Sequence, residues 1–312
     1  MRENATVDQK SLILVNTAVL LFGTAGLFAR ELTLPSIAIT FGRVFFSSLT
    51  LGIVMMIRRI PFRIASRKDL FLLAAAGALL ALHWWSFMES IKRGGVAVGT
   101  ITFSSFPLFV TFLEPVIYRE KLQAKNAVMA LVILLGVIIT IPSFSLENTS
   151  FTAILIGMAS ALCYALLALM NRGLSRRCGG IVTSFYEQLT AAIVLLPMIG
   201  RVEASPSARD ILLLMILGIF MTALAHTMFI QSLRGIPAGL AGICSSMETV
   251  YGILLAYLVL GEAPALREVI GGAVILAAVI LAQLKHPDTG KSKPNKKKKK
   301  NRYSSEINQR LK

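Results

Sequence analysis

The chain has 312 residues, of which 55% are hydrophobic and only 15% are charged. Charged side chains are too scarce to cover so much apolar surface in water, which excludes a soluble domain and places the chain in a bilayer. The net charge of +16 does not indicate a nucleic-acid partner, because much of the excess lies in the polar tail 285–312, around the lysine run 296–300. We expect this tail to be disordered, cytoplasmic and attracted to anionic lipid head groups.

In chain order, ten apolar segments are long enough to cross a hydrocarbon layer of about 30 Å as helices. They lie at 12–29, 36–57, 70–91, 96–118, 124–141, 151–170, 181–199, 211–231, 238–260 and 267–284. Gly and Pro residues mark most of the joins, and the short links at 92–95 and 234–237 are predicted to be tight turns. The first segment lacks a small-residue cleavage site and therefore reads as a retained helix.

The chain contains an internal duplication. Residues 87–92 (FMESIK) and 229–234 (FIQSLR) resemble each other at an offset of about 142 positions, and each stretch leads to a glutamate at a helix end, Glu120 and Glu262. Five helices per half is an odd number, so the two halves must cross the membrane in opposite senses.

The predicted fold is therefore an all-α integral membrane protein, with ten transmembrane helices arranged as two inverted five-helix repeats. The expected boundaries are a cytoplasmic N-terminus at 1–11, a first repeat at 12–141, a second repeat at 151–284 and the basic tail at 285–312. With the N-terminus in the cytoplasm, the inner loops hold roughly twice as many Lys and Arg residues as the outer loops. Both termini are thus predicted to be cytoplasmic.

This layout resembles a known family. Ten spans in two halves, the closures Arg119-Glu120-Lys121-Leu122 and Gly261-Glu262-Ala263-Pro264, and the link Lys92-Arg93-Gly94-Gly95-Val96-Ala97 are similar to the drug/metabolite transporter superfamily, specifically its EamA-type bacterial members. The resemblance covers the chain from about Leu12 to Leu284. It implies a secondary carrier of the bacterial inner membrane, commonly an exporter of amino acids or other small metabolites, with a central cavity between the halves.

Ionisable groups inside spans are costly and point to a binding site. The candidates for binding substrate or protons are Arg43, His83, Glu114, Glu187, His226 and Glu248, with the hydroxyl groups of Ser104, Thr111 and Ser245. Ser104, Pro107, Thr111 and Glu114 recur at steps of three and four, which predicts one stripe of the fourth span facing a wet cavity. One of the acids could bind the amine of an amphoteric substrate while Arg43 binds the carboxylate of the same substrate.

Each of these residues also has a structural interpretation. Glu114 and Glu248 are equally the kind of residue that forms interhelical bonds, Arg43 a partner for a nearby glutamate, and His226 a hydrogen-bonded core histidine. Glu262 and Glu120 are expected to pack at the membrane interface and to accept hydrogen bonds from backbone amides, and Glu89 is expected to pair with Lys92. Aromatic residues are candidates for a pocket and, alternatively, for lipid-facing packing: Trp85, Phe87, Phe106, Tyr164, Tyr186 and Tyr251.

The function predicted from the sequence is secondary active transport of a small metabolite by alternating access. The preferred prediction is export of amino acids or amine-bearing compounds, and coupling to protons is a further hypothesis. The alternatives are a facilitative carrier or channel for another solute, such as a nucleotide-sugar or a drug-like cation, and a membrane enzyme. No catalytic or ATP-binding motif is present, so no enzyme activity is expected. Cys163, Cys178 and Cys244 lack metal-site spacing, and neither a metal nor a cofactor is expected.

Overall fold

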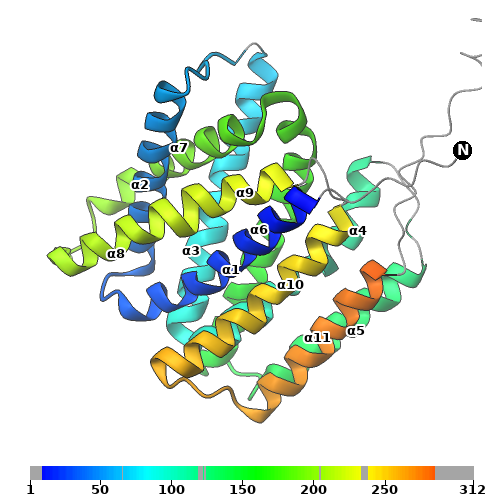
Figure 1. Cartoon of the computed structure of the whole chain (residues 1–312). Coiled ribbons are helices and arrows are strands. Elements are labelled where there is room, and N and C mark those ends of the chain that lie inside the picture. The colour runs from blue at the N-terminus through cyan, green and yellow to red at the C-terminus, as the bar shows by residue number, and fades with distance from the viewer. Residues whose placement is uncertain are drawn as a thin grey trace, which may run out of the picture.

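All regular elements in the described part of the chain are helices (Figure 1). The computed structural model describes residues 9–64, 66–118, 122, 124–203, 205–232 and 238–284. The first half holds α1 (Gln9–Glu31), α2 (Ser36–Ile57), α3 (Arg67–Phe103), α4 (Phe106–Tyr118) and α5 (Ala124–Thr140). The second half holds α6 (Thr149–Cys178), α7 (Gly180–Ile199), α8 (Ala208–Gly218), the π-helix η1 (Ile219–Leu224), α9 (Ala225–Ser232), α10 (Ala238–Leu255), the π-helix η2 (Ala256–Leu260) and α11 (Leu266–Leu284).

The ten predicted crossings are confirmed, and six helical runs are long and apolar enough to span a membrane by themselves, among them the eighth crossing, which is made of α8, η1 and α9. The fifth and tenth crossings are the shorter helices α5 and α11, and the fourth and ninth each combine two pieces. The fourth crossing was predicted as one helix over 96–118, which is wrong: it consists of the last turns of α3 and the separate helix α4, with a turn at Ser104 and Ser105 between them. Pro107 lies just after this turn, where its missing N–H costs little because a helix start leaves that donor unpaired anyway.

The third and fourth crossings meet at Gly95, where α3 changes direction. Gly95 has φ 86° and ψ 170°, a conformation that side chains rarely adopt. Beside it, Glu262 Oε2 accepts a hydrogen bond from the Val96 N–H at 3.0 Å, while Glu262 Oε1 pairs with Arg30 Nε at 2.5 Å. The expected role of Glu262 in satisfying a backbone amide is confirmed. Glu120, Arg234 and the basic tail lie outside the described residues.

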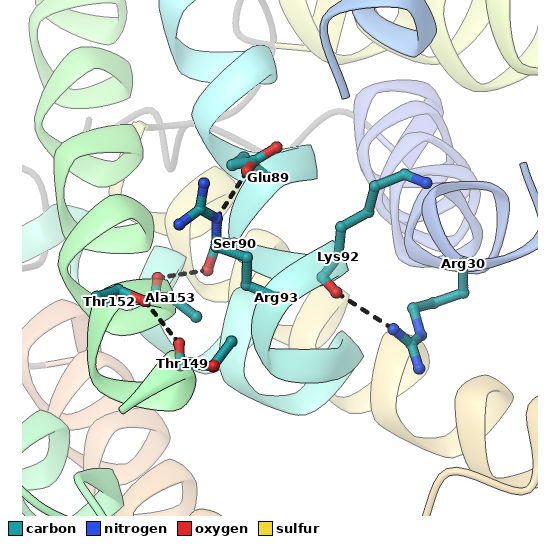
Figure 2. A network of polar contacts seen from close by, with 8 residues as sticks. All are labelled: Arg30, Glu89, Ser90, Lys92, Arg93, Thr149, Thr152 and Ala153. Carbon is teal, nitrogen blue, oxygen red and sulfur yellow. Dashed lines mark hydrogen bonds and ion pairs between the residues drawn. The ribbon is translucent and has the colours of Figure 1, made fainter. Parts of the chain in front are cut away.

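Further polar contacts surround this bend (Figure 2). Arg30 Nη1 donates to the Lys92 carbonyl at 3.4 Å, and the Ser90 hydroxyl donates to the Ala153 carbonyl of α6 at 2.8 Å. Glu89 pairs with Arg93, one turn onward, at 2.6 Å, rather than with the expected Lys92. We call this end of the bundle the first face. The second face is the end that holds Asp69, since Asp69 and Gly95 are 26 residues apart, about 39 Å along α3.

The two halves interleave, so that most extensive helix pairings join one half to the other. In the first half α1, α2, α3 and α5 pack against α10, α7, α6 and α11 of the second. In Figure 1, α5 and α11 run side by side at one edge of the bundle. The hydrophobic core therefore lies at the junction of the halves, where residues such as Ala161, Phe87 and Leu217 are buried together.

Pairs of glycines show that the halves are related by inversion. A Cβ on Gly77 of α3 would lie 2.5 Å from the Glu187 carbonyl oxygen of α7, and a Cβ on Gly218 of α8 would lie 2.9 Å from the Arg43 carbonyl oxygen of α2. The starts of these helices match too, because Ser66 and Ser207 each accept from the N–H of an aspartate three residues later, Asp69 and Asp210. The same contact is thus made twice, with the roles of the halves exchanged.

The repeat offset changes by one residue at the π-helix η1. Before it, Ser66 matches Ser207 and Gly77 matches Gly218, both at an offset of 141 (207 − 66 and 218 − 77). After it, Phe87 matches Phe229 at an offset of 142 (229 − 87). A π-turn accommodates an extra residue within an α-helix. The bulge in the second half is therefore the site of a one-residue insertion relative to the first half.

Candidate functional site

The centre of the bundle contains a buried arginine. Arg43 of α2 is 2% exposed, and its Nε donates to Thr222 Oγ1 of η1 at 3.1 Å. Its guanidinium carbon lies 4.0 Å from the centroid of the Trp84 ring of α3, a cation–π contact. Thr222 is available there because of the π-turn, in which its hydroxyl donates to the Leu217 carbonyl five residues earlier at 2.8 Å. One extra residue in the second half thus helps to hold the cation of the first half.

A buried acid and histidine form a second polar contact beside the first. Glu187 of α7 is 0% exposed, and its Oε2 lies 3.0 Å from Nε2 of His226 on α9. The imidazole also meets the Trp84 ring edge to face at 5.8 Å between centroids. Trp84 therefore contacts both Arg43 and His226, and it connects the two polar contacts.

Glu248 completes this central charged cluster, which we define as Arg43, Glu187, His226 and Glu248. It is partly buried on α10, and its charge interacts with that of Arg43. The charges of Glu187 and Glu248 both act on Tyr164 of α6. The cluster thus draws its groups from α2 in one half and from α7, α9 and α10 in the other.

An aromatic wall adjoins the cluster. Its members are His83, Phe87, Phe103, Phe106 and Tyr164. The His83 and Tyr164 rings lie 5.0 Å apart, and those of Phe106 and Tyr164 lie 5.2 Å apart at 86°. His83 Nδ1 is 2.8 Å from the Ser160 hydroxyl of α6, which fixes the ring. Such a surface accepts planar or apolar groups, while the neighbouring charges orient polar ones.

The hydroxyl groups predicted on one stripe of the fourth crossing do not share one. Ser104 lies at the break between α3 and α4, where its Oγ is 2.5 Å from Thr249 Oγ1 of α10. Thr111 donates to the carbonyl of Pro107 at 2.8 Å and so satisfies its own helix. The turn at Ser104 and Ser105 removes Ser104 from the predicted stripe, whereas Pro107, Thr111 and Glu114 keep their spacing of four and three residues on α4.

The remaining candidates lie at varying distance from the cluster. Glu114, Trp85 and Ser245 are partly buried on α4, α3 and α10. The Tyr186 hydroxyl donates to the carbonyl of Phe62 in the connection between α2 and α3, and Tyr251 packs against Gly23 of α1. The structure therefore brings Arg43, Glu187, His226 and Glu248 together with His83, Phe87, Phe106 and Tyr164, and it directs Tyr186 and Tyr251 elsewhere.

From the sequence, Trp84 was one of several aromatic residues that could line a pocket and Thr222 a neighbour of His226 on its helix, but their contacts with Arg43 were not predicted and Ser160 was not considered. Trp84 and Trp85 are adjacent in the sequence, and only the orientation of α3 in the structure shows that Trp84 is the one that contacts Arg43. A usable signal existed for Thr222, because the repeat offset rises from 141 to 142 within the eighth crossing, and an insertion in a membrane helix marks a local bulge.

Comparison with known proteins identifies the family. The EamA-like transporter family matches residues 9–141 and again 151–284. The chain belongs to the EamA-like transporter family. The two matches correspond to the two interleaved halves, and they place the central charged cluster at the junction of the two EamA units.

Individual relatives are transporters by name. An uncharacterized transporter YxxF of Bacillus subtilis is 24% identical over 290 residues, covering 90% of this chain and 93% of the relative. An uncharacterized transporter of Archaeoglobus fulgidus is 27% identical, covering 85% and 93%. An S-adenosylmethionine uptake transporter of Rickettsia conorii is 24% identical, covering 80% and 82%. A solved crystal structure superposes with a TM-score of 0.67 at 19% identity, covering 92% of this chain and all of the other, and shows the same fold.

Proposed function

We propose that this EamA-family transporter is a secondary carrier for amino acids or other metabolites that carry an amino-acid group, and that Arg43 and Glu248 of the central charged cluster, together with the aromatic wall, form its binding site. The observation that carries the proposal is the pair of opposite charges contributed by the two halves, buried Arg43 from one and partly buried Glu248 from the other. A site shared by two inverted halves is accessible to either side when the halves rock.

The chemistry of the cluster supports an amphoteric substrate. The guanidinium of Arg43 binds a carboxylate through paired hydrogen bonds, and the carboxylate of Glu248 attracts an ammonium group. The rings of Phe103, Phe106 and Tyr164 offer a surface for the substrate's side chain. S-adenosylmethionine carries an amino-acid group, a cationic sulfonium and a planar base, and the Rickettsia relatives named for its uptake make it a test substrate of this class.

We further propose that the chain resides in the bacterial inner membrane with both termini in the cytoplasm, and that export is its direction in the cell. The distribution of Lys and Arg among the loops supports this orientation. Fusion of a reporter active only in the periplasm to the C-terminus tests it. No signal is expected from that fusion, whereas a fusion within the 141–148 connection should give one.

The proposed substrate class is tested by counterflow in proteoliposomes. Vesicles loaded with an unlabelled neutral, basic or acidic amino acid, or with S-adenosylmethionine, are diluted into the same compound in labelled form. A transient overshoot of label identifies a carrier and its substrate, because a channel gives no overshoot. Arg43→Gln should abolish the overshoot, while Arg201→Gln, at the end of α7, should not. Absence of any overshoot in the parent protein would refute the proposed substrate class.

A further inference from the structure

The face of α7 that carries Glu187 is polar along two helical turns. Thr183, Ser184, Glu187 and Gln188 are each 0% exposed, at spacings of one, three and four residues. Among the described residues, Thr183 Oγ1, Ser184 Oγ, Glu187 Oε1 and both polar side-chain atoms of Gln188 have no hydrogen-bond partner. Each such atom costs about 1–3 kcal/mol when buried, so a row of them is not explained by packing.

This polar face connects the second face of the molecule to the Glu187–His226 pair. Helix α7 starts at Gly180, three residues after Arg177, and Thr183 lies in its first turn. Glu187 is seven residues from the helix start, about 10 Å along the axis. The hydroxyl groups of Thr183 and Ser184 can donate and accept hydrogen bonds in a relay of protons through water, and an ionisable residue inside a membrane protein, here Glu187, is the kind of group that marks a proton pathway.

The pair is also placed to communicate with the substrate site without belonging to it. His226 contacts Trp84, and the guanidinium carbon of Arg43 lies 4.0 Å from the centroid of the same Trp84 ring. The other charged or titratable groups around the pair are Arg43 from α2, His83 from α3, Tyr164 from α6 and Glu248 from α10. A change in the charge of His226 therefore acts on Arg43, which is the group that we assign to the substrate carboxylate.

We propose that the Glu187–His226 pair is the proton-binding site that couples this carrier to a proton gradient, separate from the substrate-binding groups Arg43 and Glu248, and that protons reach it along the polar face of α7. A proton taken up by the pair is held between Glu187 Oε2 and His226 Nε2. The resulting charge next to Trp84 competes with Arg43 and alters the affinity for substrate. This inference rests on the proposed carrier function.

The protein contains its own reporter for this site. It has two tryptophans and three histidines. In Trp85→Phe, Trp84 is the single tryptophan, and a protonated imidazole quenches indole fluorescence on contact. We expect acidification of the purified protein to quench Trp84. Glu187→Gln removes the carboxylate that lies 3.0 Å from the imidazole, and it should therefore give a quenching profile against pH that differs from that of the parent.

Matched variants decide the assignment. His226→Gln should abolish the quenching, whereas His83→Gln, next to Trp84 in sequence, and Glu147→Gln, exposed between α5 and α6, should preserve it. Quenching that survives in His226→Gln, or that is absent in the parent protein at every pH at which it stays folded, would overturn the proposal. Gel filtration of each variant verifies that it is folded, and this measurement requires no substrate.

A transport measurement separates this inference from the proposed function. In proteoliposomes, Glu187→Gln should keep counterflow of the amino acids or S-adenosylmethionine that the parent exchanges. Its accumulation under an imposed pH gradient should fall to a ratio of unity. Accumulation as in the parent would overturn the coupling role. If the parent shows no counterflow with any of these compounds, the proposed substrate class fails, and the fluorescence titration still decides whether the pair binds a proton.

Discussion

At the scale of single residues, the arrangement around Arg43 depends on the planarity of the guanidinium group. One face of that plane lies on Trp84, while an edge N–H reaches Thr222. A lysine ammonium has the same charge but neither the flat face nor the fixed fork of donors. A binding site that uses Arg43 is therefore expected to distinguish between these two cations, although both are basic.

The hydrogen bond between Arg43 and Thr222 gives a first prediction. Thr222→Val keeps the shape of the side chain and removes the acceptor, and it should lower the stability of the folded protein by about 1–2 kcal/mol. The measurement is the midpoint of unfolding in mixed micelles. Thr152→Val serves as the control, since the Thr152 hydroxyl donates to the carbonyl of Thr149 in the first turn of its own helix. An equal loss in both variants would show that the Arg43 bond contributes nothing specific.

At the scale of elements, the close approach of α5 and α11 depends on glycine. A Cβ on Gly136 would lie 2.6 Å from Ile275 Cγ1 and 3.0 Å from the Gly271 carbonyl oxygen. Gly136→Ala should therefore destabilise the protein by about 1–3 kcal/mol, the usual cost of overpacking. Gly200→Ala, with nothing within 4 Å of the new Cβ, should not. Thermal unfolding in detergent, followed by circular dichroism, compares the two, and equal melting temperatures would contradict the expected helix contact.

The π-turn η1 gives a different kind of prediction. Deleting Phe220, which is 47% exposed, removes the extra residue and should leave the helices on both sides in register. Deleting Val194, which is 45% exposed on the regular helix α7, turns all later residues of that helix by about 100° and should prevent folding. The yield of monodisperse protein in gel filtration is the readout. Equal yields from the two deletions would show that η1 is not an insertion.

The elements also show how far the sequence predicts this molecule. Apolar length and the repeat predicted all ten crossings, because both depend on composition along the chain. The break at Ser104 and Ser105 was not predicted, since two hydroxyl residues in a membrane helix are unremarkable until tertiary contacts with Thr249 are known. For the site, the rarity of buried charge indicated Arg43, Glu187, His226 and Glu248 as candidates. The pairing of Glu187 with His226 depends on helix packing across the halves, and no local pattern contains it.

At the scale of the whole molecule, polar ties join the two halves at both ends of the bundle. On the first face, Arg209 Nη2 pairs with Glu31 Oε2 at 2.5 Å, next to the contact of Arg30 with Glu262. On the second face, Arg177 Nε pairs with Asp69 Oδ1 at 2.8 Å. These ion pairs are partly exposed, so each contributes at most about 1 kcal/mol. That is sufficient to shift an equilibrium between two conformations of similar stability by about fivefold.

Cys178 reports on the second face, since it follows Arg177 directly. Burial and the Asp69 carboxylate raise the pKa of its thiol, while Arg177 lowers it. The thiolate is the reactive form, so labelling by a maleimide should be slow near neutral pH and should accelerate as the pH rises. Cys163 and Cys244 are buried, and peptide mass spectrometry distinguishes the three sites.

Arg177→Gln tests whether the second face opens when its tie is removed. By charge alone the substitution raises the pKa of Cys178 and slows labelling, whereas opening of the face exposes the thiol and accelerates it. We expect acceleration, up to about fivefold. Arg209→Gln, at the opposite end, should slow labelling because it favours opening of the first face. Slower labelling in Arg177→Gln would indicate a charge effect without opening.

The interleaving of the halves has a consequence for how the chain is made. Helices α1, α2 and α3 find their main packing partners in α10, α7 and α6, which are synthesised later. Until the second repeat is synthesised, the first repeat is therefore in the membrane without the two polar partners of Arg43, Thr222 and Glu248. Insertion of this protein should consequently depend on an insertase that shelters polar groups until translation is complete. Depletion of that factor should leave the first repeat accessible to membrane proteases.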